Sequence, residues 1–313
     1  MNNQSQQVIN EIKKVINGKD DIIQTVWTTF LAGGHVLLED NPGVGKTTLA
    51  MAFSCVIGLD SKRIQFTPDV VASDVIGFTM FDKGRNEFIF KEGAVMCNLL
   101  LGDEINRTST RTQAALLEAM QEGNVTVDGI TYPLPKPFHV IATQNPYGTF
   151  GTQPLPLAQL DRFMTKLSIG YPHFEDQVAM LRNRQGANPL ENLQPVLTKE
   201  EVIQLQHQVE QLFIHEEILR YVTALTETTR NHAQLAQGVS PRGAIAVCKM
   251  AKAYAFVQGR DFVIPEDVMA IWLPTCEHRI TISNAQPDVD EKKILKQILQ
   301  SVATPDKAML ASL

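Results

Sequence analysis

The chain has 313 residues, more than one domain usually contains, so two domains are expected. Hydrophobic residues make up 44% of the chain, which is typical of a globular protein. The net charge is -6, which argues against electrostatic binding of nucleic acid by the chain as a whole. The polar start lacks the basic-then-apolar pattern of a signal peptide, and no segment is apolar and long enough to span a bilayer. Four widely spaced cysteines without a metal-ligand pattern indicate reduced thiols, so a cytoplasmic location is expected.

Five short apolar runs alternate with helical segments in the first half of the chain. The runs cover residues 35–38, 63–66, 98–101, 138–142 and 166–169, and helices are expected between them, for example at 47–57 and 112–121. Continuous apolar runs fit parallel strands that are buried on both faces. The alternation of strand and helix therefore predicts an α/β fold with a five-stranded parallel sheet.

Two hairpins are expected to interrupt this alternation. Residues 125–132 contain Asp128–Gly129 between β-rich flanks, which is the strongest short hairpin signal. Residues 78–90 read as a second hairpin around Gly84. On composition alone, both hairpins can also be surface decoration.

After residue 172 the strand signal fades and helix signals replace it. Thr198 and Glu201 form a capping box, and Ser240 precedes Pro241 at a second helix start. A third helix is expected from residue 265, stopped near Pro274, and a last amphipathic stretch covers 294–299. We therefore predict an α/β core over residues 1–185 and a smaller all-α lid over residues 186–313.

The segment LEDNPGVGKTT, residues 38–48, resembles a phosphate-binding loop between a strand and a helix. Gly43 and Gly45 permit the backbone turns that cup phosphates, and Lys46 is placed to reach the β- and γ-phosphates. Thr47 is expected to place its hydroxyl on Mg²⁺. Asp40 stands where the general pattern has its first glycine. We expect Asp40→Gly to leave ATP binding nearly intact and Lys46→Ala to abolish it.

Two further runs end in polar residues that suit the same site. Asp103 and Glu104 follow an apolar strand, as in a Walker B motif, so Asp103 is expected to hold Mg²⁺ and Glu104 to act as the general base. Asn145 follows the fourth run and is placed to contact the attacking water or the γ-phosphate. The alternatives are a helix cap or solvated acidic pair for the two acids, and a turn residue for Asn145.

Two arginines are candidates for stabilising the charge that develops during hydrolysis. Arg162 lies in the segment LDRF just before the fifth run, and Arg242 follows Ser240 and Pro241. Arg162 is expected to face outward, where it serves only a neighbouring subunit. For both residues the alternative is a surface salt bridge.

These residues, in this order, resemble the MoxR family of AAA+ ATPases, which belongs with magnesium chelatase ATPase subunits in the clade that carries an insertion in helix 2. The matching segments run from about residue 16 to residue 280. They are HVLLEDNPGVGKT, FTPDVVASDVIG, GDEINR, TQAALLEAMQEGNVTVDG, FHVIATQNP, LAQLDRF, GVSPRGAIAVCKMAKAYAFVQGRDFVIPEDV and HRI. The resemblance implies a P-loop AAA+ core followed by a helical lid.

The resemblance also assigns roles to individual residues. Asn145 is implied as sensor 1, Arg162 as the finger that reaches a neighbour's nucleotide, and Arg242 as sensor 2, acting from the lid of the same subunit. The hairpins become the helix-2 insert, residues 78–91, and the pre-sensor-1 hairpin, residues 124–134. The implied nucleotide contacts are Ile16 and Gly18 beside the adenine, Pro42, Gly43, Val44, Gly45, Lys46, Thr47 and Thr48 in Walker A, and Asp103 in Walker B. Gly243 departs from the pattern, since a better helix former is usual there.

The function implied is an ATP-hydrolysing remodeller that works as a ring, most simply a hexamer, and matures partner proteins that carry von Willebrand factor A domains. The cofactors implied are ATP and Mg²⁺. Two alternatives stay open: a nucleotide-gated scaffold with little turnover, and a DNA-directed motor. Nucleic acid is the weaker choice because the second hairpin has only acidic Asp128 at its tip. GTPase activity is disfavoured because no Asn-Lys-x-Asp motif occurs in the sequence.

Overall fold

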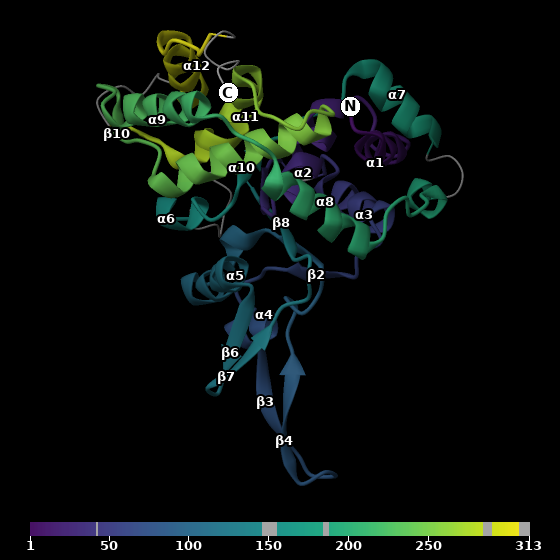
Figure 1. The fold of residues 1–313 in the computed structure, drawn as a ribbon. Helices are drawn as coiled ribbons and strands as arrows, with labels where there is room; N and C mark the ends of the chain where they lie inside the picture. The colour runs from purple at the N-terminus through teal and green to yellow at the C-terminus, as the bar shows by residue number, and fades with distance from the viewer. Residues whose placement is uncertain (42, 146–154, 184–187, 284–289, 307–313) are drawn as a thin grey trace.

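The computed structural model describes residues 1–41, 43–145, 155–183, 188–283 and 290–306 (Figure 1). A five-stranded parallel sheet with the strand order β2-β5-β8-β1-β9 lies at its centre. The strands are β1 (Val36–Glu39), β2 (Ser61–Gln65), β5 (Leu99–Asp103), β8 (His139–Gln144) and β9 (Thr165–Leu167). Each strand falls on or beside one predicted run, so the predicted α/β fold is confirmed.

Burial along the strands follows from their place in the sheet. Every residue of β5 and β8 is buried, as the continuous apolar runs require. By contrast, β2 alternates between exposed and half-buried residues, because it is an edge strand with one neighbour.

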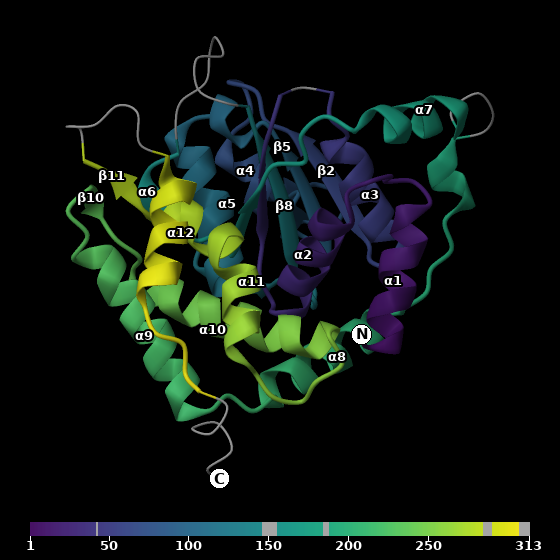
Figure 2. The ribbon, with the colours of Figure 1, turned by 90° about the horizontal axis from the view of Figure 1, so that it is seen from above.

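Helices cover both faces of the sheet (Figure 2). In β5, Leu99 and Leu101 pack with α1 (Asn3–Lys13), α2 (Asp20–Leu31) and α3 (Lys46–Val56), whereas Leu100 packs on the other face with α5 (Thr110–Glu122) and the short α4 (Ala72–Ile76). Successive side chains of a strand point to opposite faces, so one apolar strand serves two cores. Within the described residues no helix is long and apolar enough to cross a bilayer.

Both predicted hairpins are present, and both project away from the sheet (Figure 1). The first joins β3 (Gly77–Asp82) to β4 (Glu87–Glu92), and the second joins β6 (Asn124–Val127) to β7 (Ile130–Pro133). The ring of Phe90 stacks on Tyr132 with 3.9 Å between centroids, which places the hairpins side by side.

The second half of the chain is helical, as predicted, but it is not all-α, because β10 (Leu235–Gln237) and β11 (Thr281–Ile282) form a short antiparallel pair there. Its long helices are α8 (Lys199–Gln211), α9 (Glu216–Arg230), α10 (Pro241–Val257), α11 (Pro265–Cys276) and α12 (Glu291–Ser301). The capping box holds: the Glu201 amide donates to the Thr198 hydroxyl at 3.3 Å, and the Thr198 amide donates to the Glu201 carboxylate at 2.8 Å. Pro274 lies inside α11, which ends two residues beyond it; a proline so near the end of a helix removes only one of the last hydrogen bonds.

Short elements complete the described chain. They are α6 (Leu157–Leu160), α7 (Phe174–Asn183), β10 (Leu235–Gln237), β11 (Thr281–Ile282) and the 3₁₀ turns Ile105–Arg107, Pro189–Asn192 and Glu277–Arg279. The helices α9 to α12 share a core of their own, whereas α8 packs Val202, Leu205 and Val209 into the core of α1 to α3. The division at residue 186 stays a prediction, and α8, which follows it, is tied to the first core.

Candidate functional site

The loop between β1 and α3 has the shape of a phosphate cradle. Gly43 and Gly45 have φ of 86° and 99°, in the left-handed region that favours glycine, and Gly45 caps the start of α3. A Cβ built on either glycine meets nothing within 4 Å, so open space lies in front of the backbone. Pro42 lies outside the described residues. The free N–H groups of the first turn of α3 can therefore face an anion.

Lys46 is buried beneath this loop. Its ammonium donates to the main-chain carbonyl of Asp40 at 2.6 Å and to Asn145 Oδ1 at 3.5 Å. Burial lowers the pKa of Lys46, and the carboxylates of Asp40, Asp103 and Glu104 oppose that shift. The ammonium is thus held at the carboxyl ends of β1 and β8, where a bound phosphate would complete its partners.

A cavity of about 290 Å³ opens beside the loop. It is lined by loop residues, by Ile16, and by residues from 169–172, α7 and 188–190. Val44 and Thr48 also line the cavity. Ile16, implied to lie beside the adenine, and these two Walker A residues therefore border the same cavity. Gly18 is not among the lining residues, but a Cβ on it would stand 1.9 Å from the carboxylate of Asp176, which does line the cavity. Tyr171 and Asp176 also line the cavity, and neither was assigned a role from the sequence, although Tyr171 lies two residues after the predicted fifth strand.

Asp103 and Glu104 lie at the carboxyl end of β5, next to the loop. The Arg63 guanidinium donates from Nε and Nη2 to Asp103 Oδ2, both at 2.8 Å, and the Thr143 hydroxyl lies 3.4 Å from the other oxygen. Arg63 is a partner that the sequence reasoning missed. It is recognisable only once the sheet order places β2 beside β5.

Glu104 is held by its backbone and by two side chains. It has φ of 56°, uncommon for a residue with a Cβ, and its amide donates to the Thr143 hydroxyl at 2.9 Å. One carboxylate oxygen accepts from Asn145 Nδ2 at 3.0 Å, and the other accepts from Arg107 at 2.8 Å. Unusual backbone angles of this kind are found at functional sites, where the surroundings hold them in place.

The environment sets the charge of Glu104. Partial burial raises the pKa of this carboxyl, but hydrogen bonds from Arg107 and Asn145 and the nearby Lys46 charge lower it by more, so the net pKa lies below the usual value. Glu104 is therefore ionised at neutral pH and available to accept a proton. Lys46, Asn145 and Glu104 form one continuous chain of polar contacts, so three residues that were assigned separately to one site lie together.

Asp40 has a role that the sequence did not reveal. Its side chain points away from the loop, and its carboxylate accepts from the Ser168 hydroxyl at 2.8 Å, the Ile169 amide at 2.5 Å and the Gly170 amide at 3.1 Å. Gly170 is one of the cavity-lining residues. Asp40 thus ties the phosphate loop to the wall of the adjoining cavity.

The two candidate arginines do not reach the phosphate loop of their own chain. Arg162 is half-buried rather than facing fully outward, and it donates to the Leu117 carbonyl at 2.9 Å. Exposed Arg242 lies 3.3 Å from the Gln121 side chain. Gln121 follows Met120, whose carbonyl contacts His35 just before β1, so Arg242 lies toward the amino edge of the sheet, opposite the phosphate loop. The expectation that Arg242 reaches the nucleotide of its own subunit is wrong for this structure.

The donor set suits Mg²⁺. Asp103 offers a carboxylate oxygen at the buried end of β5. Thr47, the second residue of α3, offers a hydroxyl oxygen just after the cradle. Oxygen donors of this kind are what Mg²⁺ prefers, with water and phosphate oxygens filling its other positions. Thr47 and Asp103 are the residues that would hold it.

Comparison with known proteins agrees with this geometry. Residues 35–165 match the family "ATPase family associated with various cellular activities (AAA)", and residues 227–298 match an AAA lid domain. The fold and site are thus those of an AAA ATPase. The chain is 39% identical over 311 residues to Chaperone MoxR1 of Mycobacterium tuberculosis H37Rv, covering 96% of this chain and 82% of that protein. It belongs to the MoxR family of AAA+ ATPases.

Other relatives extend the same comparison. YeaC of Bacillus subtilis strain 168 is 45% identical over 299 residues, which cover 95% of this chain and 93% of YeaC. Protein MoxR of Paracoccus denitrificans is 30% identical, covering 87% of this chain and 86% of that protein. A crystal structure from Cytophaga hutchinsonii ATCC 33406, described as a candidate ATPase, superposes with a TM-score of 0.90 at 35% identity and covers 97% of this chain and 96% of its own.

Proposed function

We propose that the protein hydrolyses ATP to ADP and phosphate. The observation that carries the proposal is the chain of contacts from Lys46 through Asn145 to Glu104, set beside an open glycine cradle. A cation for the phosphates, an amide to orient water and an ionised carboxylate to accept its proton are the groups that this reaction needs.

Each group has one task in the proposed mechanism. The loop amides and Lys46 hold the β- and γ-phosphates, and Asn145 orients a water toward the γ-phosphorus. Glu104 takes the proton of that water as the oxygen attacks, and the bond to the β-phosphate oxygen breaks. Thr47 and Asp103 would hold Mg²⁺, whose charge would be available to neutralise that of the phosphate oxygens.

We propose further that catalysis needs a neighbouring subunit, as in a ring, most simply a hexamer. Arg162 and Arg242 contact Leu117 and Gln121, which lie one turn apart on α5, so both arginines gather on one side of the molecule away from their own loop. A second subunit whose nucleotide faced this side would receive both cations. Arg162 is then the finger, and Arg242 acts on the same neighbouring site.

The work done with ATP is, in our proposal, the remodelling or maturation of partner proteins. A relative is named a chaperone, and the two hairpins extend an exposed surface away from the ATPase core (Figure 1). Proteins with von Willebrand factor A domains are the partners that the family resemblance suggests. A cytoplasmic location is supported by the four free cysteines.

A DNA-directed motor has less support. The tip of the first hairpin carries two basic residues, Lys83 and Arg85. Arg85 lies 4.0 Å from Asp82 and 3.9 Å from Glu87, so its charge is partly neutralised. The pairs are exposed and weak, but a phosphate grip needs several free cations. Salt-sensitive DNA binding at physiological ionic strength would revive this alternative.

The test is ATP turnover by purified variants. Glu104→Gln is expected to bind ATP and lose roughly 10²–10⁴ in rate, as for a lost general base, while Lys46→Ala loses binding. Glu227→Gln, an exposed acid on α9, is the matched control and should turn over like the parent. Parent-like turnover by Glu104→Gln contradicts the base assignment.

The ring and the partner need their own measurements. Specific activity should rise with protein concentration, and Arg162→Ala subunits should poison parent rings when mixed in. Rings that are unaffected by added Arg162→Ala subunits contradict the role of Arg162 as a finger.

Tagged Glu104→Gln protein with ATP should retain a partner protein that Lys46→Ala protein does not retain. A scaffold would instead show no turnover, with or without that partner.

A further inference from the structure

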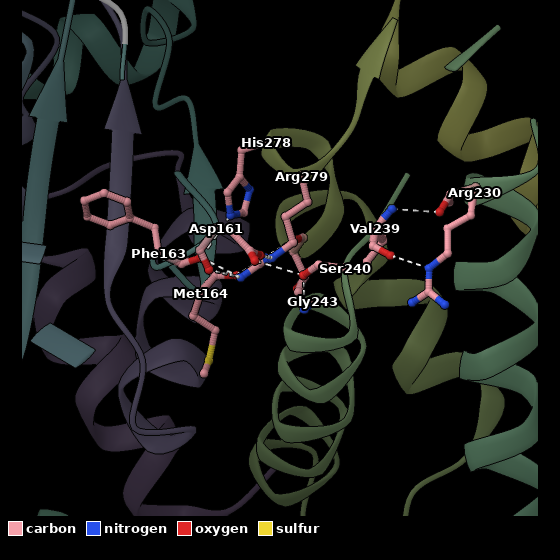
Figure 3. A network of polar contacts seen from close by, with 11 residues as sticks. Asp161, Phe163, Met164, Arg230, Val239, Ser240, Gly243, His278 and Arg279 are labelled. Carbon is pink, nitrogen blue, oxygen red and sulfur yellow. Dashed lines mark hydrogen bonds and ion pairs between the residues drawn. The ribbon is translucent and has the colours of Figure 1, made fainter. Parts of the chain in front are cut away.

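The side chain of Arg279 is buried between the ATPase core and the lid (Figure 3). Its Nε donates to Asp161 Oδ1 at 2.7 Å, and its terminal nitrogens donate to the main-chain carbonyls of Asp161, Phe163, Met164 and Thr275. The neighbouring His278 adds a contact of 2.9 Å to the Phe163 carbonyl. A planar fork with five donors can satisfy this many fixed acceptors at once, which an ammonium cannot.

The same carboxylate is shared with the lid. Asp161 Oδ2 accepts from the Ser240 hydroxyl at 2.9 Å, and the Ser240 oxygen in turn accepts from the Gly243 amide at 3.0 Å, capping α10. Asp161 therefore joins Arg279 and the first turn of α10 to the chain just before β9.

Gly243 is explained by the same contact. A Cβ built on Gly243 would lie 2.8 Å from Arg279 Cδ and 2.6 Å from Val239 Cγ1. The residue that departs from the family pattern is thus the one that lets the stem of Arg279 lie against α10.

The network surrounds both arginines that the mechanism assigns to a neighbour. Arg162 lies between Asp161 and Phe163, which Arg279 holds, and Arg242 lies between Ser240 and Gly243. We propose that Arg279 is a positioning residue that holds Arg162 and Arg242 as one unit fixed to the lid. The inference rests on the proposed role of Arg162 in a neighbouring site.

This role differs from that of a merely stabilising ion pair. Arg260 and Asp267 form a second arginine–carboxylate pair, in which Asp267 is buried and Arg260 is half-buried. Among the described residues, the other hydrogen bond of the Arg260 side chain goes to the Phe262 carbonyl of the lid. Its substitution should lower stability without touching Arg162. Arg260→Lys is therefore the matched control for Arg279→Lys, which keeps the charge and loses the fork.

The experiment measures kcat, the KM for ATP and nucleotide affinity of Arg279→Lys and Ser240→Ala, at a temperature where circular dichroism shows each variant folded. We expect parent-like nucleotide affinity and KM, with kcat at least about tenfold lower for Arg279→Lys, as a displaced finger requires. Ser240→Thr, which keeps the hydroxyl, should restore the rate lost in Ser240→Ala.

Mixed rings separate positioning from general damage. Arg279→Lys subunits keep an intact ATP site but offer a displaced finger, whereas Glu104→Gln subunits offer an intact finger and a dead site. Mixing the two should recover turnover above the sum of each alone. Recovery with Arg162→Ala in place of Arg279→Lys is the parallel control.

The outcomes are distinguishable. If Arg162→Ala loses turnover while folded Arg279→Lys keeps the parent kcat, the positioning role is overturned and the proposed function stands. If Arg260→Lys lowers kcat as much as Arg279→Lys does, the effect is general damage and the inference is again overturned. If Arg162→Ala itself turns over like the parent, the proposed finger fails and the positioning role falls with it.

Discussion

Replacing Asp40 should weaken the fold more than it weakens the phosphate site. In Asp40→Gly, the buried amide of Ile169, the half-buried amide of Gly170 and the Ser168 hydroxyl lose one carboxylate acceptor. Hydrogen bonds to a charged group contribute about 1.5–3 kcal/mol each, and water that enters the vacated space recovers part of this. We therefore expect the free energy of unfolding to fall by about 2–4 kcal/mol.

Nucleotide affinity should change little in the same variant. Lys46 is held by the main-chain carbonyl of Asp40, which glycine also provides, so we expect the Kd for ATP to stay within about threefold, or ~0.7 kcal/mol.

Urea denaturation measures the first quantity, and hydrogen exchange at Ile169 and Gly170 shows whether protection is lost locally. Asn41→Gly, at the exposed next residue, is the matched control for adding a glycine to this loop. A change in unfolding free energy below ~0.5 kcal/mol for Asp40→Gly, typical of an indifferent surface site, refutes the reasoning.

Three further predictions follow from single contacts. Gly243→Ala should lower the melting temperature, because the added Cβ would meet Arg279. The same change in an unobstructed helix stabilises the helix by ~1 kcal/mol, so a higher melting temperature contradicts the prediction. Burial lowers the pKa of His139 to about 3, below the unfolded value near 6.5, so stability is complete above pH 6.5 and is lost as pH falls toward 3. In His139→Gln, the slope of the unfolding free energy against pH, measured with urea, should be smaller than in the parent by about 1.4 kcal/mol per pH unit between about pH 6 and 4. Equal slopes for parent and variant refute this. Arg63→Ala frees buried Asp103 from an exposed arginine partner in a pair of ~1 kcal/mol, so the Mg²⁺ concentration needed for half-maximal nucleotide binding at low salt should fall about fivefold. An unchanged titration contradicts this.

The sheet was predictable because its strands carry a local signal. Runs such as 99–101 are apolar at every position, which only a strand covered on both faces tolerates, and the structure places them so. The strand order was not predictable, since nothing local in the sequence states that β8 lies between β5 and β1. The contact of Arg63 with Asp103 depends on that order and was missed for the same reason.

The parts of the site that one segment supplies were predictable, and the parts that need two segments were not. The glycine cradle and the Asp103–Glu104 pair are short patterns whose chemistry can be read directly. The placement of Arg242 depends on how the lid docks on the core, and the prediction of a contact within the same subunit was wrong. Asp40 was recognised as an exception to a pattern, but its partners lie at residues 168–170, far along the chain.

The segment around β9 connects these observations. This strand has three residues and one neighbour, β1, so the sheet alone holds it weakly. Side chains from elsewhere fix both of its ends: Arg279 binds the chain before it, beside Arg162, and Asp40 binds the chain after it, at the wall of the nucleotide cavity. In the proposed ring, we therefore expect a shift of the cavity wall to displace Arg162 as well. Occupancy of one subunit's cavity would then be linked to the arginine presented to the next subunit, through the two clamps rather than through the sheet.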